Sequence, residues 1–219
     1  MKKGKKLFLL SLLLGISLVM AACGANPAET MYDHLEEAVA LEAGFESQQK
    51  PLVEAEQKEH EIYEQIIELG ISELEEIIAL SDQAIQIVDE RQEMMNIEKE
   101  SIEAGYEEFV KIEEQIEKLE EEEVKQSALE LLTIMENRYN SYQALFAEYE
   151  KALNLDRELY EMLKQEDANI DELQEQIDQI NASYEIVVTL KDEFNEYTEQ
   201  YNEQKREFYE KAELDVEYE

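Results

Sequence analysis

Almost nothing in this sequence interrupts a helix after its first 51 residues. No proline follows Pro51 and no glycine follows Gly105, whereas a fold built from strands needs turn residues at short, regular intervals. Apolar residues recur instead at steps of three, four or seven, which is the spacing of one face of an α-helix. The sequence therefore predicts an all-α fold.

Several helix boundaries are marked by residues that favour helix ends. Asn26 is expected to be an N-cap, followed by a proline at the first helical position, and Asn169 is a second expected N-cap. Gly70 stands where a left-handed C-cap is expected, and Ser72 begins a capping box. Pro51 either starts a new helix or kinks a long one, and the sequence leaves both readings open.

These signals divide the chain into long helical arms joined by short turns, which favours antiparallel neighbours. The spacing of the apolar residues drifts between a heptad and a 3.6-residue period, and this suits an elongated bundle better than a strict two-stranded coiled coil. The predicted fold is an elongated antiparallel helical bundle, a coiled-coil-like rod of about four long helices, with a dimeric coiled coil as the competing architecture. The expected arms cover about 27–69, 72–123, 124–167 and 170–214.

The first 22 residues have the composition of a cleaved signal peptide. Four lysines lie between Lys2 and Lys6, and an apolar run from Leu7 to Met20 follows them. That run is too short for a permanent helix across a hydrocarbon core of roughly 30 Å, but it is typical of the apolar region of a secretion signal.

The apolar run leads into Met20-Ala21-Ala22-Cys23, which contains the only cysteine of the chain. This segment resembles a bacterial lipobox, in which the cysteine thiol is diacylated and the chain is cut before it, although leucine is more usual than Met20 at the first position. A free thiol after an ordinary signal sequence is the alternative. Two acyl chains suffice for stable anchoring.

The expected organisation is therefore a cleaved lipoprotein signal peptide (1–22), a lipidated tether (23–26) and a single acidic helical-bundle domain (27–219). The expected location is extracytoplasmic, at the outer face of the cell membrane, through a diacylglyceryl anchor on Cys23. A single cysteine also excludes an intramolecular disulfide framework and a cysteine zinc site.

The charge balance excludes several classes of partner. The chain carries 56 acidic and 19 basic side chains and a net charge of −37, which becomes −41 once four lysines leave with the signal peptide. Such a charge repels nucleic acid and anionic lipid head groups at long range. We therefore expect no nucleic-acid partner.

The candidate chemical groups argue against catalysis. The two histidines, His34 and His60, lack the Glu-x-x-His spacing of a di-iron bundle and are expected on solvated helix faces. Met94-Met95 lies in a helical apolar stripe and is expected to fill the core. The sequence has no glycine-rich phosphate loop, no Gly-x-Ser-x-Gly and no His-Glu-x-x-His motif. No cofactor, no dedicated metal site and no enzymatic activity are expected.

Two other features have a structural and a functional reading. The first is a pair of aromatic stripes, which form either a stacking surface for wall sugars or, as we expect, a seam between adjacent helices. The second is the acidic run Glu120–Glu123, which is expected to be a solvated charge run with weak divalent-cation binding at most. The stripes consist of Tyr139, Tyr142, Phe146 and Tyr149, and of Phe194, Tyr197, Tyr201 and Phe208.

Over nearly its whole length the chain resembles the YkyA family of cell-wall-binding lipoproteins from Bacillus-type bacteria. The resemblance implies a lipid-anchored, extracytoplasmic, all-helical protein of a Gram-positive cell, and Cys23 is the only functional position that it transfers. The segments that carry it are the lipobox, 48–53 (QQKPLV), 62–67 (IYEQII), 98–104 (EKESIEA), 159–163 (LYEML) and 194–202 (FNEYTEQYN).

Two functions remain open at this point. One is a non-catalytic wall-binding or spacer module that contacts peptidoglycan or another wall polymer, and the other is a helical adaptor that docks another envelope protein. A lateral groove lined by tyrosines favours the first, and a long solvent-facing apolar stripe favours the second. A deep cleft that encloses two carboxylates would revive an enzyme as a third reading.

Overall fold

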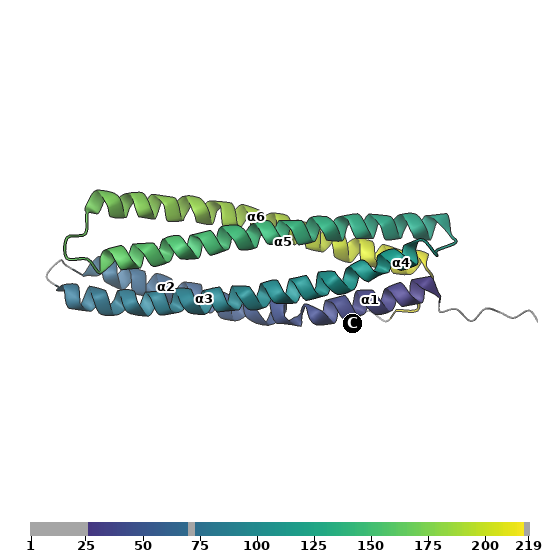
Figure 1. Ribbon diagram of the computed structural model, residues 1–219, viewed down its shortest axis with the longest axis horizontal. Helices are drawn as coiled ribbons and strands as arrows, with labels where there is room; N and C mark the ends of the chain where they lie inside the picture. The colour runs from purple at the N-terminus through teal and green to yellow at the C-terminus, as the bar shows by residue number, and fades with distance from the viewer. Residues whose placement is uncertain (1–25, 70–72, 217–219) are drawn as a thin grey trace, which may run out of the picture.

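The computed structural model describes residues 26–69 and 73–216, which form four antiparallel helical arms packed into an elongated bundle (Figure 1). The first arm contains two helices, and the second ends in a short 3-10 turn and one further helical turn. This arrangement confirms the predicted all-α rod. The elements are α1 (Pro27–Leu41), α2 (Ala43–Glu68), α3 (Leu74–Phe109), η2 (Val110–Ile112), α4 (Glu113–Ile116), α5 (Glu122–Leu163) and α6 (Ile170–Lys211).

The predicted N-caps of the first and last arms are present. The side-chain oxygen of Asn26 accepts a hydrogen bond from the Ala28 amide at 3.0 Å, and that of Asn169 accepts one from the Asp171 amide at 2.9 Å. These bonds satisfy amide groups that have no partner within the helix. The predicted signals at Gly70 and Ser72 lie outside the described residues.

The second arm ends earlier than the acidic run suggested, because α4 stops at Ile116 and α5 begins at Glu122. Glu122 and Glu123 instead occupy the first turn of α5, where the helix dipole favours negative charge.

Pro51 neither starts a helix nor divides the first arm; it lies inside α2. Its missing N–H leaves the Ser47 carbonyl without the usual helical donor, but Ser47 is exposed, so water can satisfy that oxygen. The break in the first arm falls instead at Glu42, between α1 and α2.

Two side chains from other arms stabilise the break at Glu42. The Ser101 hydroxyl donates to the Leu41 carbonyl at 2.7 Å and accepts from the Phe45 amide at 3.1 Å, replacing helical hydrogen bonds across the break. Arg138 of α5 binds both carboxylate oxygens of Glu42, each at 2.7 Å. Tertiary contacts therefore decide where this arm bends.

The interior is divided into two hydrophobic clusters along the rod. We call the end of the rod that holds Asn26 the proximal end, and the end that holds the α2–α3 and α5–α6 connections the distal end (Figure 1). The proximal cluster includes Met31 and Leu35 of α1 together with Phe208 of α6. The distal cluster includes Ile62 of α2, Met95 of α3 and Tyr149 of α5.

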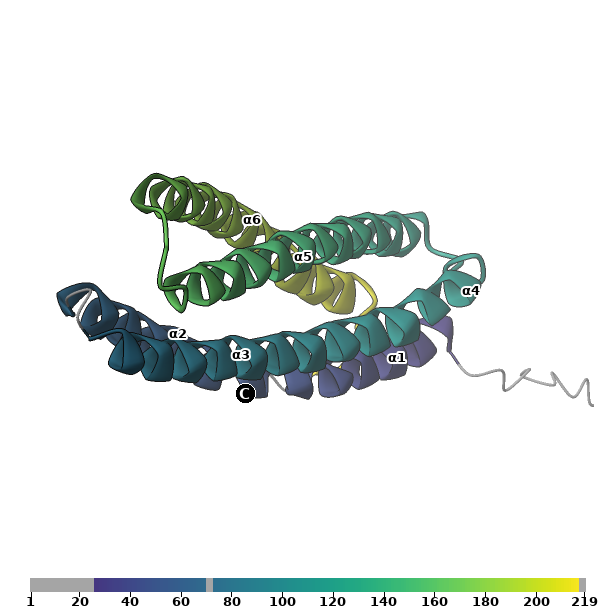
Figure 2. The same cartoon turned by 60° about the vertical axis from the view of Figure 1, so that its left-hand side comes forward.

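The bundle is closed at its proximal end and open on one side farther along. Near the proximal end α6 packs on α1, where the Tyr209 hydroxyl donates to Glu36 at 2.6 Å and the Tyr32 and Tyr209 rings lie 5.2 Å apart. Toward the distal end α6 stays against α5 but diverges from α2 (Figure 2). This divergence creates the groove described below.

The crossing of α1 and α3 depends on Gly105. A Cβ atom at this position would lie 2.8 Å from Cγ of Glu42 and 3.1 Å from the carbonyl oxygen of Ala38. Arg138 restrains the Glu42 side chain, so neither neighbour can move aside freely.

We therefore expect Gly105→Ala to lower the free energy of unfolding by about 1–2 kcal/mol, because overpacking outweighs the gain in helix propensity of about 1 kcal/mol. Urea unfolding followed by circular dichroism measures this change. A variant as stable as the wild type, or more stable, would show that the two arms separate readily at this crossing.

Candidate functional site: a lateral groove with a buried arginine

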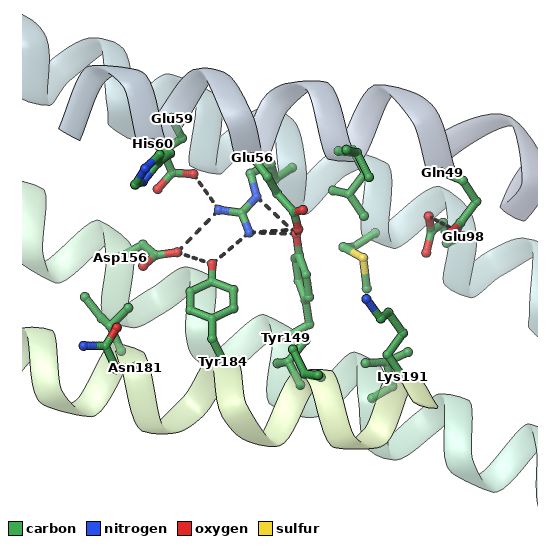
Figure 3. Close-up of a pocket in the computed structure, with 18 of the residues that line it drawn as sticks. Gln49, Glu56, Glu59, His60, Glu98, Tyr149, Asp156, Asn181, Tyr184 and Lys191 are labelled. Atoms are coloured by element: carbon green, nitrogen blue, oxygen red, sulfur yellow. Dashed lines mark hydrogen bonds and ion pairs between the residues drawn. The ribbon is translucent and has the colours of Figure 1, made fainter. Parts of the chain in front are cut away.

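A cavity of about 720 Å³ lies between the α2–α3 pair and the α5–α6 pair, on the side where α6 diverges from α2 (Figure 3). We call it the groove. Its rim carries Val53 of α2 and Val188 of α6, which are 60% and 51% exposed. Its apolar lining also includes Ile177 and Ile180 of α6, which the apolar stripe suggests as core residues. They line the groove because none of the described helices covers that part of α6.

The floor of the groove is formed around Arg91 of α3, which is only 2% exposed. Its guanidinium donates to the Tyr149 hydroxyl at 2.7 and 3.1 Å and to the Tyr184 hydroxyl at 2.8 Å. It also donates to Glu59 at 2.5 Å and to Asp156 at 3.4 Å. All four arms contribute to this cluster.

Glu56 completes the cluster, with its carboxylate 3.5 Å from Arg91 and accepting a hydrogen bond from Tyr149 at 2.5 Å. Tyr184 donates in the same way to Asp156. We call these six residues the Arg91 centre, which is drawn with its hydrogen bonds in Figure 3. Its members are Glu56, Glu59, Arg91, Tyr149, Asp156 and Tyr184.

The Arg91 centre holds three carboxyl groups against one guanidinium, so negative charge is in excess. Burial, with the neighbouring Glu59 carboxylate, raises the pKa of Asp156 to about 7 despite its contacts with Tyr184 and Arg91. Burial opposes the charge of Arg91, but the Tyr149 and Tyr184 hydroxyls and Glu59 outweigh it, so the pKa of Arg91 is raised above its ordinary value. The guanidinium stays charged at any physiological pH.

A further carboxyl group, Glu98 of α3, is buried in the wall of the groove and is 3% exposed. Its hydrogen bond comes from the neutral amide of Gln49, with the two atoms 2.8 Å apart. Burial and the nearby Glu56 raise the pKa of Glu98 to about 7, although the Gln49 bond acts in the opposite direction. In the part of the chain that the structure describes, no cation pairs with Glu98.

The facing wall of the groove, on α6, has different chemistry. Lys191 points its ammonium group into the groove, and Asn181 lies on the same wall (Figure 3). Asn195 continues the row. Among residues 26–69 and 73–216, these three side chains have no hydrogen-bond or ion-pair partner. The groove therefore has an acidic wall on α2 and α3 and a wall of unpaired donors on α6.

Some of the candidate residues taken from the sequence line the groove, namely His60, Met95, Tyr149 and Phe194, and the others lie away from it. Cys23 and the rest of the lipobox are outside the described residues, so lipidation stays a prediction. Met95 is buried and Met94 packs against the same cluster, which confirms their role as core filler. The Tyr142 and Phe194 rings lie 5.3 Å apart between α5 and α6, so the two aromatic stripes meet in a helix seam at this point, whereas Tyr139 stacks on Tyr106 of α3.

The expectation of solvated histidines is correct for one of the two. His60 is exposed at the groove, with Nε2 3.5 Å from the Glu64 carboxylate. His34 is half-buried and its Nδ1 lies 2.7 Å from Glu108, so the prediction of a solvated side chain was wrong there. An isolated helical stripe does not show that α3 brings Glu108 to this histidine.

The acidic run Glu120–Glu123 lies in the α4–α5 connection and the first turn of α5. Within the described ranges, no three histidine, cysteine or acidic side chains are grouped so that they could share a metal ion. The same ranges contain no helix that is both long and apolar enough to cross a membrane.

The polar residues of the groove are not revealed by the apolar periodicity, because they do not belong to the apolar repeat. The apolar stripe of α3 runs Val88, Met95, Ile102 in steps of seven. Arg91 and Glu98 stand three residues after the first two of these, at the alternate seam positions of a heptad. A charged residue at a seam position of a continuous stripe is the signal that could have found them.

Comparison with known proteins agrees with this architecture. The model of the YkyA family, described as "Putative cell-wall binding lipoprotein", matches residues 26–211. The chain belongs to the YkyA family. It is 35% identical over 198 residues to the "Uncharacterized lipoprotein YkyA" of Bacillus subtilis, covering 90% of this chain and 89% of that protein. The chain is thus a member of a lipoprotein family.

A crystal structure of a conserved protein of unknown function from Staphylococcus aureus has the same fold. The TM-score is 0.60 at 14% identity, and the match covers 83% of this chain and 91% of the other. At this identity the likeness concerns the fold alone.

Proposed function

We propose that this chain is a non-catalytic, lipid-anchored extracytoplasmic protein that binds wall polymer in the groove and holds it at a distance from the membrane. The observation that carries the proposal is the lateral groove, which is open between Val53 and Val188 and has several tyrosines in its lining. A lateral opening admits part of a long polymer. Among these, the half-buried Tyr63 and Tyr184 present ring surface to the groove, which suits a sugar or a peptide.

The position of the groove along the rod supports this role. The groove extends along α2 from Phe45 to Tyr63. At 1.5 Å per helical residue, these positions lie roughly 27 and 54 Å along the first arm from Pro27. With the rod standing upright on the membrane, a chain anchored at Cys23 by two acyl groups would present the groove well beyond the roughly 8 Å over which membrane charge acts at physiological salt.

The groove is a better binding surface than the exterior of the rod. Teichoic acids are polyphosphates, so a domain with a net charge near −41 repels them unless divalent cations or alanyl esters intervene. The glycan and peptide parts of the wall are not polyphosphates and meet no such barrier. We therefore place recognition on the peptidoglycan itself.

Catalysis is the less favoured reading, even though the groove encloses several carboxyl groups. Glu59 and Asp156 bind Arg91, and Glu56 binds Tyr149. A general acid–base pair needs carboxyl groups aimed at substrate, whereas these three carboxyl groups are bonded to Arg91 and Tyr149 within the floor. Incubation with sacculi should therefore release no soluble fragments.

The adaptor function is the second candidate. The exposed Val53 and Val188 on the rim are apolar enough to contact a helix from another envelope protein. The charged floor disfavours it, because an apolar helix face would cover Glu98 and the carboxylates of the Arg91 centre without pairing them.

Co-sedimentation of residues 27–219 with isolated sacculi tests the proposal. The assay is run with and without teichoic acid, in Mg²⁺ and in EDTA, with Val188→Glu as the groove variant. Ile97→Glu is the matched control, because Ile97 is 45% exposed on α3 and does not line the groove. We expect pelleting that survives EDTA and teichoic-acid removal, and a roughly tenfold weaker affinity for Val188→Glu only, since burial of one valine contributes about 1.5 kcal/mol.

Other outcomes separate the alternatives. Pelleting lost in EDTA would mean that cations bridge the acidic surface to the wall, and equal losses in both variants would remove the groove from the account. No pelleting under any condition would contradict wall binding and favour the adaptor.

The anchor has its own prediction. Cys23→Ala removes the thiol that carries the diacylglyceryl group, so we expect the protein to leave the membrane fraction and appear in the medium or the wall fraction. Fractionation of cells that express each form measures this, with Cys23→Ser as a second variant. Membrane retention of both variants would show that something other than the lipid holds the chain.

A further inference from the structure

Glu98 is a buried carboxyl group of the groove that pairs with no cation among the described residues. Glu98 is 3% exposed, its hydrogen bond comes from a neutral amide, and Glu56 lies close enough to raise its pKa. A buried carboxylate without a cationic partner is costly. The Arg91 guanidinium cannot serve as that partner, because its N–H groups already donate to other members of the Arg91 centre and none is spare.

The opposite wall carries exposed donor groups of complementary chemistry. Lys191, Asn181 and Asn195 of α6 are unpaired among the described residues, and Lys191 points into the groove. An ammonium and two amide groups bind a carboxylate and backbone carbonyls. Val188 lies on the same helix as this row and Val53 lies on α2, and both suit aliphatic side chains.

We propose that the groove binds a short peptide that carries a free primary ammonium group and a carboxylate, with the ammonium against Glu98 and Glu56 and the carboxylate against Lys191. This rests on the proposed function and names the part of the wall that is recognised: the peptides of peptidoglycan, which bear both groups, and not the glycan strand. A glycan has no ammonium for Glu98, and an apolar chain would leave both polar walls unpaired.

The test combines a change in the protein with a change in the ligand. The probes are peptides released from sacculi by an amidase, in native form and after acetylation of their amino groups, titrated calorimetrically into residues 27–219. The protein variants are Glu98→Gln and, as matched control, Glu100→Gln, which makes the same change at an exposed position of α3.

We expect acetylation of the peptide to weaken its binding to the wild type at least tenfold. Glu98→Gln should weaken the binding of the native peptide by a similar factor. Because both changes remove the same contact, acetylation should have little further effect on the affinity of the Glu98→Gln variant. Glu100→Gln should bind like the wild type. Lys191→Gln should weaken the binding of the native peptide, and acetylation should still weaken binding to this variant.

The inference is overturned if acetylated and native peptides bind alike, if the effects of acetylation and Glu98→Gln add, or if peptide-free glycan strands bind instead. These results leave wall binding in place when sacculi still pellet the protein. Conversely, peptide binding without sacculus binding would contradict the proposed function and keep the ligand assignment, so the two failures are distinguishable.

Discussion

Arg91→Met should lower the free energy of unfolding by roughly 3–5 kcal/mol, which is the cost of removing one partner from a buried ion pair. Methionine fills the space of the side chain but leaves Glu59 and Asp156, both largely buried, facing each other without the guanidinium. For a domain of this size the expected fall in Tm is roughly 6–20 °C. Chemical and thermal unfolding both measure it.

Arg157→Met is the control for Arg91→Met. Arg157 also lies on the bundle and pairs with Asp89, but both side chains are substantially exposed. An exposed pair contributes at most about 1 kcal/mol, so this variant should unfold nearly as the wild type does.

A combined variant shows whether the unpaired carboxylates cause the loss. Adding Glu59→Gln and Asp156→Asn to Arg91→Met removes the uncompensated charge and should recover more than half of the lost stability. No recovery would mean that Arg91 acts through packing against the tyrosine rings. Equal losses for Arg91→Met and Arg157→Met would contradict the burial of this centre.

The second large effect is a loss of stability as the pH rises. Glu98 and Asp156 both have a pKa of about 7 in the folded protein, well above their ordinary values. Between about pH 4.5 and 7 the folded state therefore holds protons that the unfolded state has released, so stability falls as pH rises through this range. We expect a loss of roughly 1–3 kcal/mol per carboxyl group, complete above about pH 8.

Glu98→Gln should remove the part of this pH-dependent loss of stability that Glu98 causes. The variant should match the wild type near pH 5 and be the more stable protein at pH 8, because a neutral amide carries no charge to bury. Glu100→Gln, at an exposed position on the same helix, should follow the wild type at both pH values. A wild type that becomes more stable from pH 5 to 8 would contradict the assignment.

The helices and their caps could be predicted because they depend on local chemistry. Asn26 and Asn169 cap helices through bonds to amides two residues away, and the long proline-free segments contain nothing that stops a helix. The break at Glu42 could not be predicted, because Ser101 and Arg138 on other arms create it. Pro51 was the stronger local signal and was tolerated.

The groove could not be predicted from the spacing of apolar residues, for a different reason. A stripe such as that of Ile177 and Ile180 shows which face of α6 is apolar, but not whether another helix covers it. Here α6 diverges from α2, and these residues line an opening. Arg91 and Glu98 occupy seam positions that an apolar count passes over, and only the packed arms show what they meet.

Photo-crosslinking in intact cells tests the central claim most directly. A photoreactive amino acid at Val188, on the rim of the groove, is compared with the same amino acid at Ile97, which is similarly exposed outside the groove. We predict that the Val188 protein becomes attached to high-molecular-weight wall material that a muramidase reduces to small adducts, and that the Ile97 protein does not. Crosslinking of Val188 to another protein, or equal attachment to the wall from both positions, would contradict wall binding in the groove.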